Sequence, residues 1–279
     1  MVRRLLLTGA GGFIGRHVPA LMAARGFEVH AVGRQQVDLL DAEATDALVA
    51  EIGASHLLHL AWYTEHGKFW AAPENRDWAE ATLRLARSFR EAGGERLVAA
   101  GTCAEYGPSS LYGTAKDATH RELDAYVADT GLSFAWGRVF FPYGPGERPE
   151  RVVPAVARAV IAGEPVACSS GEQIRDFLHV EDVAAAFAAL VDSKATGSFD
   201  IGSGEGVPLR DVLLTLERLA GRNEIVQLGV LPARDEPASL VADVARLRDE
   251  VGWRPSVGLE EGLERTLAWW REAILAPHS

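Results

Sequence analysis

Short apolar runs alternate along the chain with longer stretches whose apolar residues recur at helical spacing. A run at residues 5–7 precedes a helical pattern over about 12–25, and a second run follows at 29–32. The alternation continues with predicted helices over 41–52, 75–92 and 112–130 and predicted strands over 56–61, 96–100 and 132–139. Helical crossovers between parallel strands produce such a pattern. We therefore predict an α/β fold whose first part is a doubly wound parallel sheet of the Rossmann type.

The texture of the sequence changes at residues 142–149, where three prolines and two glycines interrupt any regular element. Predicted helices over 152–161 and 182–191 come next, and a predicted strand at 198–201 would return the chain to the first sheet. Further helices are predicted over 209–219, 240–251 and 259–274. We expect a Rossmann domain made of residues 1–141 plus 178–203 and a smaller α/β substrate-binding domain made of residues 142–177 plus 204–279.

A glycine-rich loop directly follows the first predicted strand and precedes a helical pattern. Its glycines are spaced three and three, whereas the common dinucleotide fingerprint is spaced two and three. Glycines in this context let the backbone turn sharply and approach a pyrophosphate closely. We predict that the loop binds a dinucleotide through Gly9, Gly12, Phe13, Ile14 and Gly15.

Composition and charge narrow the range of partners. The chain has 279 residues, of which 48% are apolar and 24% charged, as in ordinary globular proteins. Its net charge of −11 repels nucleic acid and anionic membranes, so we expect neither as a partner. The sequence has no run of about twenty apolar residues, so we predict no transmembrane helix. The two cysteines, Cys103 and Cys168, do not make a disulfide scaffold, so we expect the protein in the reducing environment of the cytoplasm.

Tyr112 and Lys116 lie four residues apart at the start of a predicted helix, so their side chains share one face. A tyrosine hydroxyl has a reference pKa of about 10 and needs a nearby cation to transfer protons at neutral pH. Lys116 supplies that cation, and the chain has only three lysines in all. The alternative interpretation is a surface pair without a function.

Several further motifs follow one another along nearly the whole chain. They are His59-Leu60-Ala61, Thr102 with Tyr106-Gly107, Arg138, Tyr143-Gly144-Pro145-Gly146, Arg175-Asp176-Phe177-Leu178-His179-Val180 with Asp182, and Gly252-Trp253-Arg254-Pro255. With the glycine loop and the Tyr112/Lys116 pair, the chain resembles the extended short-chain dehydrogenase/reductase family, specifically its nucleotide-sugar epimerases, dehydratases and reductases.

The resemblance implies roles for individual residues. Thr102 would hydrogen-bond the reacting sugar oxygen, although a cap at a strand end is the alternative. Lys116 would also bind the nicotinamide ribose, next to Leu60 and Ala61 in the cofactor site. A nucleoside-diphosphate sugar is the implied substrate, and a homodimer is the implied assembly. The arginines that would clamp the substrate pyrophosphate, unless they are surface ion-pair partners, are Arg175 and Arg234.

Departures from the family pattern bear on the reaction. Dehydratases carry Asp-Glu directly after the Ser/Thr, whereas this chain has Cys103 and Ala104 there, which disfavours 4,6-dehydration. Cys103 stands three residues before Tyr106, while the family's fucose-forming epimerase-reductases have a cysteine two residues before the tyrosine. We therefore interpret Cys103 as a packed, inert residue.

Arg34 follows the second predicted strand, where a cofactor without a 2′-phosphate usually meets an acidic residue. An arginine there can pair with that phosphate, so we expect NADP(H) in preference to NAD(H). Asp38 matches the family position that contacts the adenine. No metal is expected.

NADPH favours net reduction. The leading hypothesis is reduction of a nucleoside-diphosphate 4-keto-6-deoxyhexose, with Thr102 and Tyr112 polarising the carbonyl. The alternatives are an NAD-dependent nucleotide-sugar 4-epimerase and a noncatalytic NADP-binding regulator. The aromatic segment at residues 62–70 would border the sugar or pack onto its own domain.

Overall fold

The protein is described by a computed structural model that covers residues 2–107, 110–233 and 236–275. The chain divides into two compact units, each built from three segments. Unit 1 consists of Met1–Val139, Val183–Ile201 and Val244–Arg254. Unit 2 consists of Phe140–Asp182, Gly202–Asp243 and Pro255–Ser279. The main difference from the predicted domain bounds is the segment at 244–254, which belongs to unit 1.

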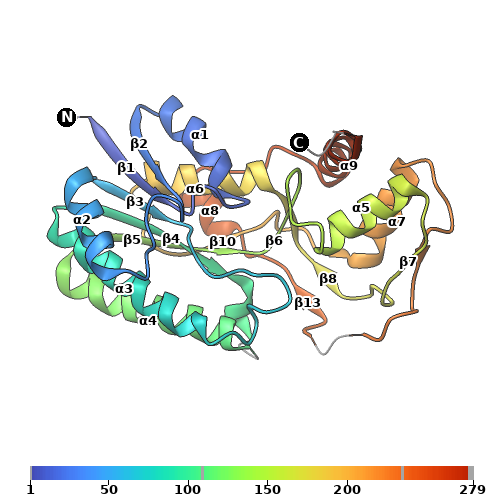
Figure 1. The fold of residues 1–279 in the computed structure, drawn as a ribbon, viewed down its shortest axis with the longest axis horizontal. Helices are drawn as coiled ribbons and strands as arrows, with labels where there is room; N and C mark the ends of the chain where they lie inside the picture. Colours follow the sequence, from blue (N-terminus) through green and yellow to red (C-terminus); the bar gives the residue numbers. More distant parts are fainter. Residues whose placement is uncertain (1, 108–109, 234–235, 276–279) are drawn as a thin grey trace. The chain divides into compact units, whose positions relative to one another are not determined.

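Unit 1 is built around a parallel sheet of six strands in the order β2-β1-β3-β4-β5-β10. The helices α2, α3 and α4 lie on one side of the sheet, and α1 and α6 lie on the other (Figure 1). The predicted doubly wound α/β fold is confirmed. The strands are β1 (Arg3–Thr8), β2 (Phe27–Val32), β3 (His56–His59), β4 (Arg96–Thr102), β5 (Ser133–Val139) and β10 (Gly197–Ile201), and the helices are α1 (Val18–Ala24), α2 (Ala42–Ile52), α3 (Glu74–Glu91), α4 (Leu111–Thr130), α6 (Val180–Asp192) and α8 (Ala245–Glu250).

Helices on both faces explain the apolar character of the strands. Leu5, Leu6 and Leu7 of β1 are at most 1% exposed, because each face of this parallel sheet is covered. On α3, the buried positions Leu85 and Phe89 recur at helical spacing and join the same core cluster as strand residues. The periodicity in the sequence therefore reports which side of each element faces the core.

The strand order reverses at β1, which pairs with β2 on one side and with β3 on the other. In doubly wound sheets, ligands bind at the carboxyl ends of the strands where the order reverses. The loops that follow β1 and β3 therefore define the part of unit 1 in which a cofactor site is expected.

The first helix begins later than predicted. A 3₁₀ turn at Gly15–His17 precedes α1, which begins at Val18, so the prediction of a helix was wrong for residues 12–17. Pro19 lies in the first turn of α1. Proline has no N–H to donate to a carbonyl one turn earlier, so it is favoured where a helix begins.

The helix predicted over 240–251 is also shorter than expected. Ser239–Leu240 forms a strand, β13, beside β8 (Ile174–Arg175), and α8 begins at Ala245. The buried carboxylate of Asp176 contributes to this, because it accepts a hydrogen bond from the amide of Ala242 at 3.1 Å. This bond to a distant residue takes the place of a helical one and cannot be found from local spacing.

Unit 2 packs three helices, α5 (Val152–Ala162), α7 (Leu209–Leu219) and α9 (Leu259–Leu275), around one apolar cluster. Their residues agree with the predicted helices. Short strands complete the unit and were not predicted, because two or three residues carry no periodicity. They are β6 (Phe141–Tyr143) paired with β9 (Phe177–His179), β7 (Val166–Ala167) paired with β12 (Val226–Gln227), and β11 (Val207–Pro208) paired with β8.

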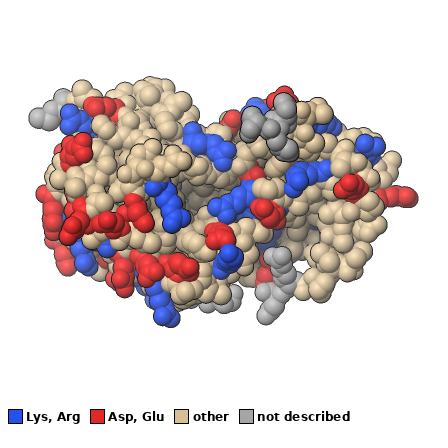
Figure 2. Space-filling view, viewed as in Figure 1, with Lys and Arg blue, Asp and Glu red and all other residues tan. Residues whose placement is uncertain are grey.

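Acidic side chains gather over α2, α3 and α4 on the visible face of unit 1 (Figure 2). This placement agrees with the negative net charge and gives nucleic acid no attractive surface there. Within the described part of the chain, no helix is both long and apolar enough to cross a bilayer.

A buried histidine ties β1, β3 and α3 together. His59 Nδ1 lies 2.7 Å from Thr8 Oγ1, and its Nε2 lies 3.0 Å from Thr82 Oγ1. The Thr82 hydroxyl donates its own hydrogen to the Trp78 carbonyl at 2.8 Å, so it accepts from His59 Nε2–H. His59 Nδ1 then accepts from Thr8, and the neutral ring satisfies both nitrogens. Burial lowers the pKa of His59 to about 3, helped by the charge of Lys116.

We expect stability to fall in acid partly because of His59. The unfolded chain protonates this histidine below about pH 6.5, whereas the fold keeps it neutral down to about 3. Stability is therefore present above about pH 6.5 and is lost as the pH falls through this window, by about 1.4 kcal/mol per pH unit. Urea unfolding of the wild type and of His59→Gln between about pH 7 and pH 5 measures this slope. Parallel curves for the two proteins would contradict the assignment.

Candidate functional site

Glycine is required where the loop after β1 meets the end of β3. Gly9 has φ 74°, and a Cβ there would lie 2.7 Å from the Ala61 amide nitrogen and 2.8 Å from the Leu60 carbonyl carbon. A Cβ on Gly15 would collide with the Gly9 carbonyl oxygen. β3 ends at His59, two residues earlier than predicted. The structure thus brings the predicted cofactor residues Gly9, Gly15, Leu60 and Ala61 together.

The loop also presents backbone donors. The amide of Gly12 donates to the Gly9 carbonyl at 3.0 Å, which closes the turn. For the amides of Gly11, Phe13 and Ile14, no acceptor is recorded in the described part of the chain. Gly11 is exposed, and Phe13 and Ile14 are half-buried. N–H groups that are left free in such a turn suit an anion such as a pyrophosphate.

Arg34 and Asp38 follow β2, next to the same loop. A Cβ on Gly33 would lie 3.9 Å from the Gly11 amide nitrogen, which shows how closely the two segments approach. Arg34 is exposed, and no ion pair or hydrogen bond of its side chain is recorded among the described residues. Asp38 is also exposed, and its carboxylate accepts from the Leu40 amide at 3.1 Å. The Arg34 guanidinium is therefore free for an anion, while the Asp38 carboxylate already shapes a turn.

Tyr112 and Lys116 occupy the first two turns of α4, as the spacing predicts. Lys116 is only 4% exposed, and its Nζ donates to the Ala100 carbonyl of β4 at 2.7 Å. Burial lowers the pKa of Lys116 to about 7, against the opposing charge of Glu105. The alternative interpretation of Tyr112 and Lys116 as a surface pair without a function is therefore excluded for Lys116, because its ammonium lies in the interior of unit 1.

Thr102 ends β4 and caps the short 3₁₀ helix η2 (Cys103–Tyr106). Its Oγ1 accepts from the Ala104 amide at 3.2 Å, so the capping alternative is present in the structure. The hydroxyl keeps its own hydrogen to donate. A Cβ on Gly113 would lie 2.5 Å from the Ala104 carbonyl oxygen. This close approach packs η2, which follows Thr102, against the first turn of α4, which carries Tyr112.

Glu105 is a buried residue of this site that the sequence analysis missed. One carboxylate oxygen accepts from the Thr102 amide at 2.7 Å, and the other lies 2.9 Å from Arg138 Nε and 3.0 Å from Trp136 Nε1. Its charge raises the pKa of Lys116 against the effect of burial. The pattern Thr102-x-x-Glu105 is a capping box, a signal that the sequence did contain.

Arg175 lies in unit 2, and its guanidinium is engaged by protein groups. It is 3% exposed and donates to the carbonyls of Ile174 (2.8 Å) and Pro237 (2.9 Å). Its Nη2 lies 2.9 Å from a carboxylate oxygen of Glu236. A substrate pyrophosphate would have to compete with these partners. Arg234, the second predicted clamp, lies outside the described residues.

Two other predicted features are found packed within unit 1. Cys103 is 8% exposed, in keeping with an inert residue. In the segment at 62–70, Phe69 is 7% exposed, and Trp62 Nε1 donates to Asn75 Oδ1 at 2.8 Å. The segment therefore packs onto its own unit, while Trp70, which is 44% exposed, remains available to a ligand.

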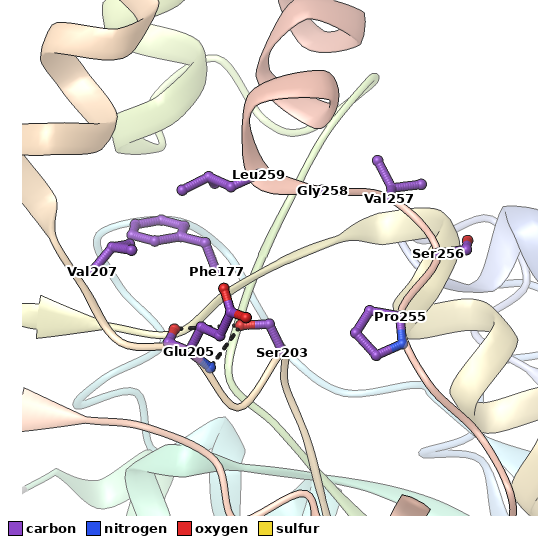
Figure 3. A pocket seen from close by; sticks show the side chains of 9 residues that line it. All are labelled: Phe177, Ser203, Glu205, Val207, Pro255, Ser256, Val257, Gly258 and Leu259. Carbon is purple, nitrogen blue, oxygen red and sulfur yellow. Dashed lines mark hydrogen bonds between the residues drawn. The ribbon is translucent and has the colours of Figure 1, made fainter.

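Unit 2 contains a pocket of about 180 Å³ (Figure 3). Ser203 Oγ and the Glu205 amide, 3.1 Å apart, fix one wall of it. Among the described residues, none of the predicted site residues lines this pocket. Its lining residues are Phe177, Ser203, Glu205, Val207, Pro255, Ser256, Val257, Gly258 and Leu259.

Comparison with known proteins identifies the family. A sequence profile of the NAD dependent epimerase/dehydratase family matches residues 5–202, which hold the glycine loop, Thr102, Tyr112 and Lys116. The chain belongs to this family. The predicted membership of the extended short-chain dehydrogenases/reductases and the predicted NAD(P)-dependent enzyme are thereby confirmed.

Individual relatives cover nearly the whole chain. It is 25% identical over 312 residues to GDP-6-deoxy-D-mannose reductase of Pseudomonas aeruginosa, covering 98% of this chain and 99% of the relative. The UDP-glucose 4-epimerase of Thermus thermophilus in complex with NAD is 29% identical, with a TM-score of 0.86 over 97% of this chain and 99% of the other. RMD from Pseudomonas aeruginosa complexed with NADPH shares the fold at 22% identity, with a TM-score of 0.84 over 97% and 99%.

We expect removal of the Glu105 carboxylate to destabilise unit 1. Glu105→Ala leaves the buried Trp136 N–H and the buried Thr102 amide without their acceptor and removes the carboxylate that pairs with the half-buried Arg138 guanidinium, at a cost of about 3–5 kcal/mol. Chemical denaturation measures the loss, with the exposed Glu122→Ala on α4 as control. A loss for Glu105→Ala no larger than that for Glu122→Ala would refute the role of this carboxylate.

Proposed function

We propose that the protein uses NADPH to reduce the 4-keto group of a nucleoside-diphosphate 4-keto-6-deoxyhexose to the 4-hydroxy sugar. The observation that carries the choice of cofactor is Arg34, exposed and without a recorded partner beside the glycine loop. A guanidinium there complements a 2′-phosphate. The similarity to GDP-6-deoxy-D-mannose reductase supports both the reduction and the class of sugar nucleotide.

The residues of the loop fit a dinucleotide. Close approach of a pyrophosphate requires a backbone without side chains, and Cβ atoms on Gly9 and Gly15 have no room in this turn. The amides of Gly11, Phe13 and Ile14, for which no acceptor is recorded among the described residues, supply donors for phosphate oxygens. NADPH held there would supply the hydride that is added to C4 of the sugar.

Tyr112 is proposed to supply the proton. When hydride adds to the carbonyl carbon, the C=O bond becomes a C–O bond whose oxygen takes the proton from the Tyr112 hydroxyl. The charge of Lys116, one turn further along α4, lowers the cost of the tyrosinate that is left. Thr102 donates its free hydroxyl hydrogen to the same sugar oxygen. Solvent then returns a proton to Tyr112.

A 4-epimerase that retains NAD is the second candidate. It is favoured by the similarity to the Thermus thermophilus UDP-glucose 4-epimerase, which was solved with NAD. The same Thr102, Tyr112 and Lys116 would serve its oxidation and reduction steps. The feature that separates the two candidates is the exposed Arg34, since NAD offers it no 2′-phosphate. A noncatalytic regulator would have no use for a proton donor such as Tyr112.

The proposed reaction is tested with purified protein, NADPH and a dTDP-4-keto-6-deoxyhexose. We expect oxidation of one NADPH per sugar reduced, and we expect Tyr112→Phe to lower kcat by about 10²–10⁴-fold, the usual contribution of a positioned acid. Tyr126→Phe on the same helix is the control and should keep the wild-type rate. Turnover of Tyr112→Phe at the wild-type rate would exclude its role. Epimerisation of a UDP-hexose with tightly bound NAD, and no NADPH oxidation, would select the second candidate.

We further expect Arg34→Ala to lose the preference for NADPH. Without the guanidinium, KM for NADPH should rise by about 10–100-fold, because a charge-assisted contact to phosphate is lost, whereas KM for NADH should change little. Steady-state kinetics with each cofactor measures the ratio. Arg87→Ala, an exposed arginine on α3, controls for the loss of positive charge. An unchanged ratio in Arg34→Ala would show that another residue selects the cofactor.

A further inference from the structure

The buried ammonium of Lys116 has an aromatic neighbour as well as a carbonyl. Its Nζ lies 3.7 Å from the centroid of the Trp62 ring and 5.5 Å from that of Trp136, while it donates to the Ala100 carbonyl at 2.7 Å. An ammonium over an indole face within about 6 Å is attracted by the ring quadrupole, most strongly when both are desolvated. Trp62 is therefore a direct contact of the charge, supplied by the segment at 62–70.

The charged state of Lys116 depends on a small balance. Burial lowers its pKa to about 7, close to physiological pH, and Glu105 from η2 is the carboxylate that raises it. His59 from β3 is kept neutral, with its own pKa lowered by burial and by Lys116. Tyr112 lies one turn earlier on α4. With the pKa this close to neutrality, a modest contribution from one contact decides how much of Lys116 is charged.

We propose that Trp62 is a positioning residue of the catalytic pair, whose indole face holds the Lys116 ammonium charged and in place. The proposal rests on the proposed function, which needs a cation beside Tyr112. The role differs from that of a packing residue, because it acts on the charged form of Lys116 and not only on the volume around it.

The indole has a fixed orientation. Asn75, which is fully buried, accepts from Trp62 Nε1 at 2.8 Å and donates through Nδ2 to the carbonyls of Phe69 (2.7 Å) and Ala72 (2.9 Å). One amide side chain thus joins the start of the segment to its end. The ring plane cannot rotate away from Lys116 without breaking the bond to Asn75.

The same segment contacts Tyr112. The Tyr112 amide donates to the Trp70 carbonyl at 3.2 Å. Its ring meets Phe69 and Trp70 edge to face, with centroids 5.0 and 5.8 Å apart. Residues 62–70 therefore hold both the proposed proton donor and its cation, from one side of α4. By packing onto unit 1, the segment therefore also serves the proposed reaction, because it contacts both Tyr112 and Lys116.

Replacement of Trp62 separates two effects of opposite sign. If the indole stabilises the charge, Trp62→Leu lowers the pKa of Lys116, because leucine has no π face. If the indole only excludes water, the smaller side chain admits water, and the pKa of Lys116 rises. The direction of the change therefore identifies the mechanism.

The experiment is an NMR titration of lysine side chains labelled with ¹³C and ¹⁵N. The chain has three lysines, and Lys68→Arg and Lys194→Arg assign the other two signals. We expect the pKa of Lys116 to fall by about 1 in Trp62→Leu, in line with a desolvated cation–π contact. Trp62→Phe, which keeps a weaker π face, should give a smaller fall and serves if the leucine variant does not fold. Trp253→Leu, a half-buried tryptophan for which the described residues place no cation over the ring, is the matched control.

An unchanged or raised pKa of Lys116 in Trp62→Leu, or the same fall in Trp253→Leu, would overturn the proposal. In the active enzyme, the pH profile of kcat should move to lower pH by the same amount in Trp62→Leu. The titration needs neither substrate nor cofactor. Failure to oxidise NADPH with any keto sugar would therefore refute the proposed function while the pKa measurement still tests the role of Trp62.

Discussion

The burial of one ammonium group constrains the whole site in unit 1. A lysine that is 4% exposed must find partners that compensate for lost water, and each partner of Lys116 comes from a different element. The Ala100 carbonyl is on β4, the Trp62 ring follows β3, and the Glu105 charge is on η2. Every element that carries a predicted reactive group is thereby placed around a single charge. Protein groups take the place of water around Lys116, and this arrangement positions the elements that carry the proposed reactive residues.

Local signals in the sequence predicted the features that depend on local geometry. The parallel sheet follows from short apolar runs that alternate with helical patterns, the glycines of the loop from a sharp turn, and the Tyr112/Lys116 pair from the helical period of 3.6 residues. The resemblance to the family placed the glycine loop and Leu60-Ala61 in one cofactor site, and the structure adds the reason, because the strand order reverses at β1. These inferences needed no knowledge of distant contacts.

Features that depend on distant partners could not be predicted. Arg175 is engaged by Glu236, and Glu105 reaches Arg138, each across dozens of residues. The strand at Ser239–Leu240 exists because it pairs with β8, although its own spacing looked helical. The sequence also could not decide between the reductase and the epimerase from Thr102, Tyr112 and Lys116, because both reactions need the same proton donor. The residue that we propose to discriminate between them is Arg34, through its contact with the cofactor.

The interleaving of the two units has a consequence for how the chain is made. Each unit is assembled from three segments, and the last segment of unit 1 is Val244–Arg254, while that of unit 2 begins at Pro255. On the ribosome, each unit therefore lacks its last segment until the chain has been made beyond Val244. The core cluster that includes α3 lies within residues 6–136 and can form earlier, whereas the contacts that β10 and α8 add to unit 1 must wait. This late step is non-local and gives chaperones a reason to act on the nascent protein.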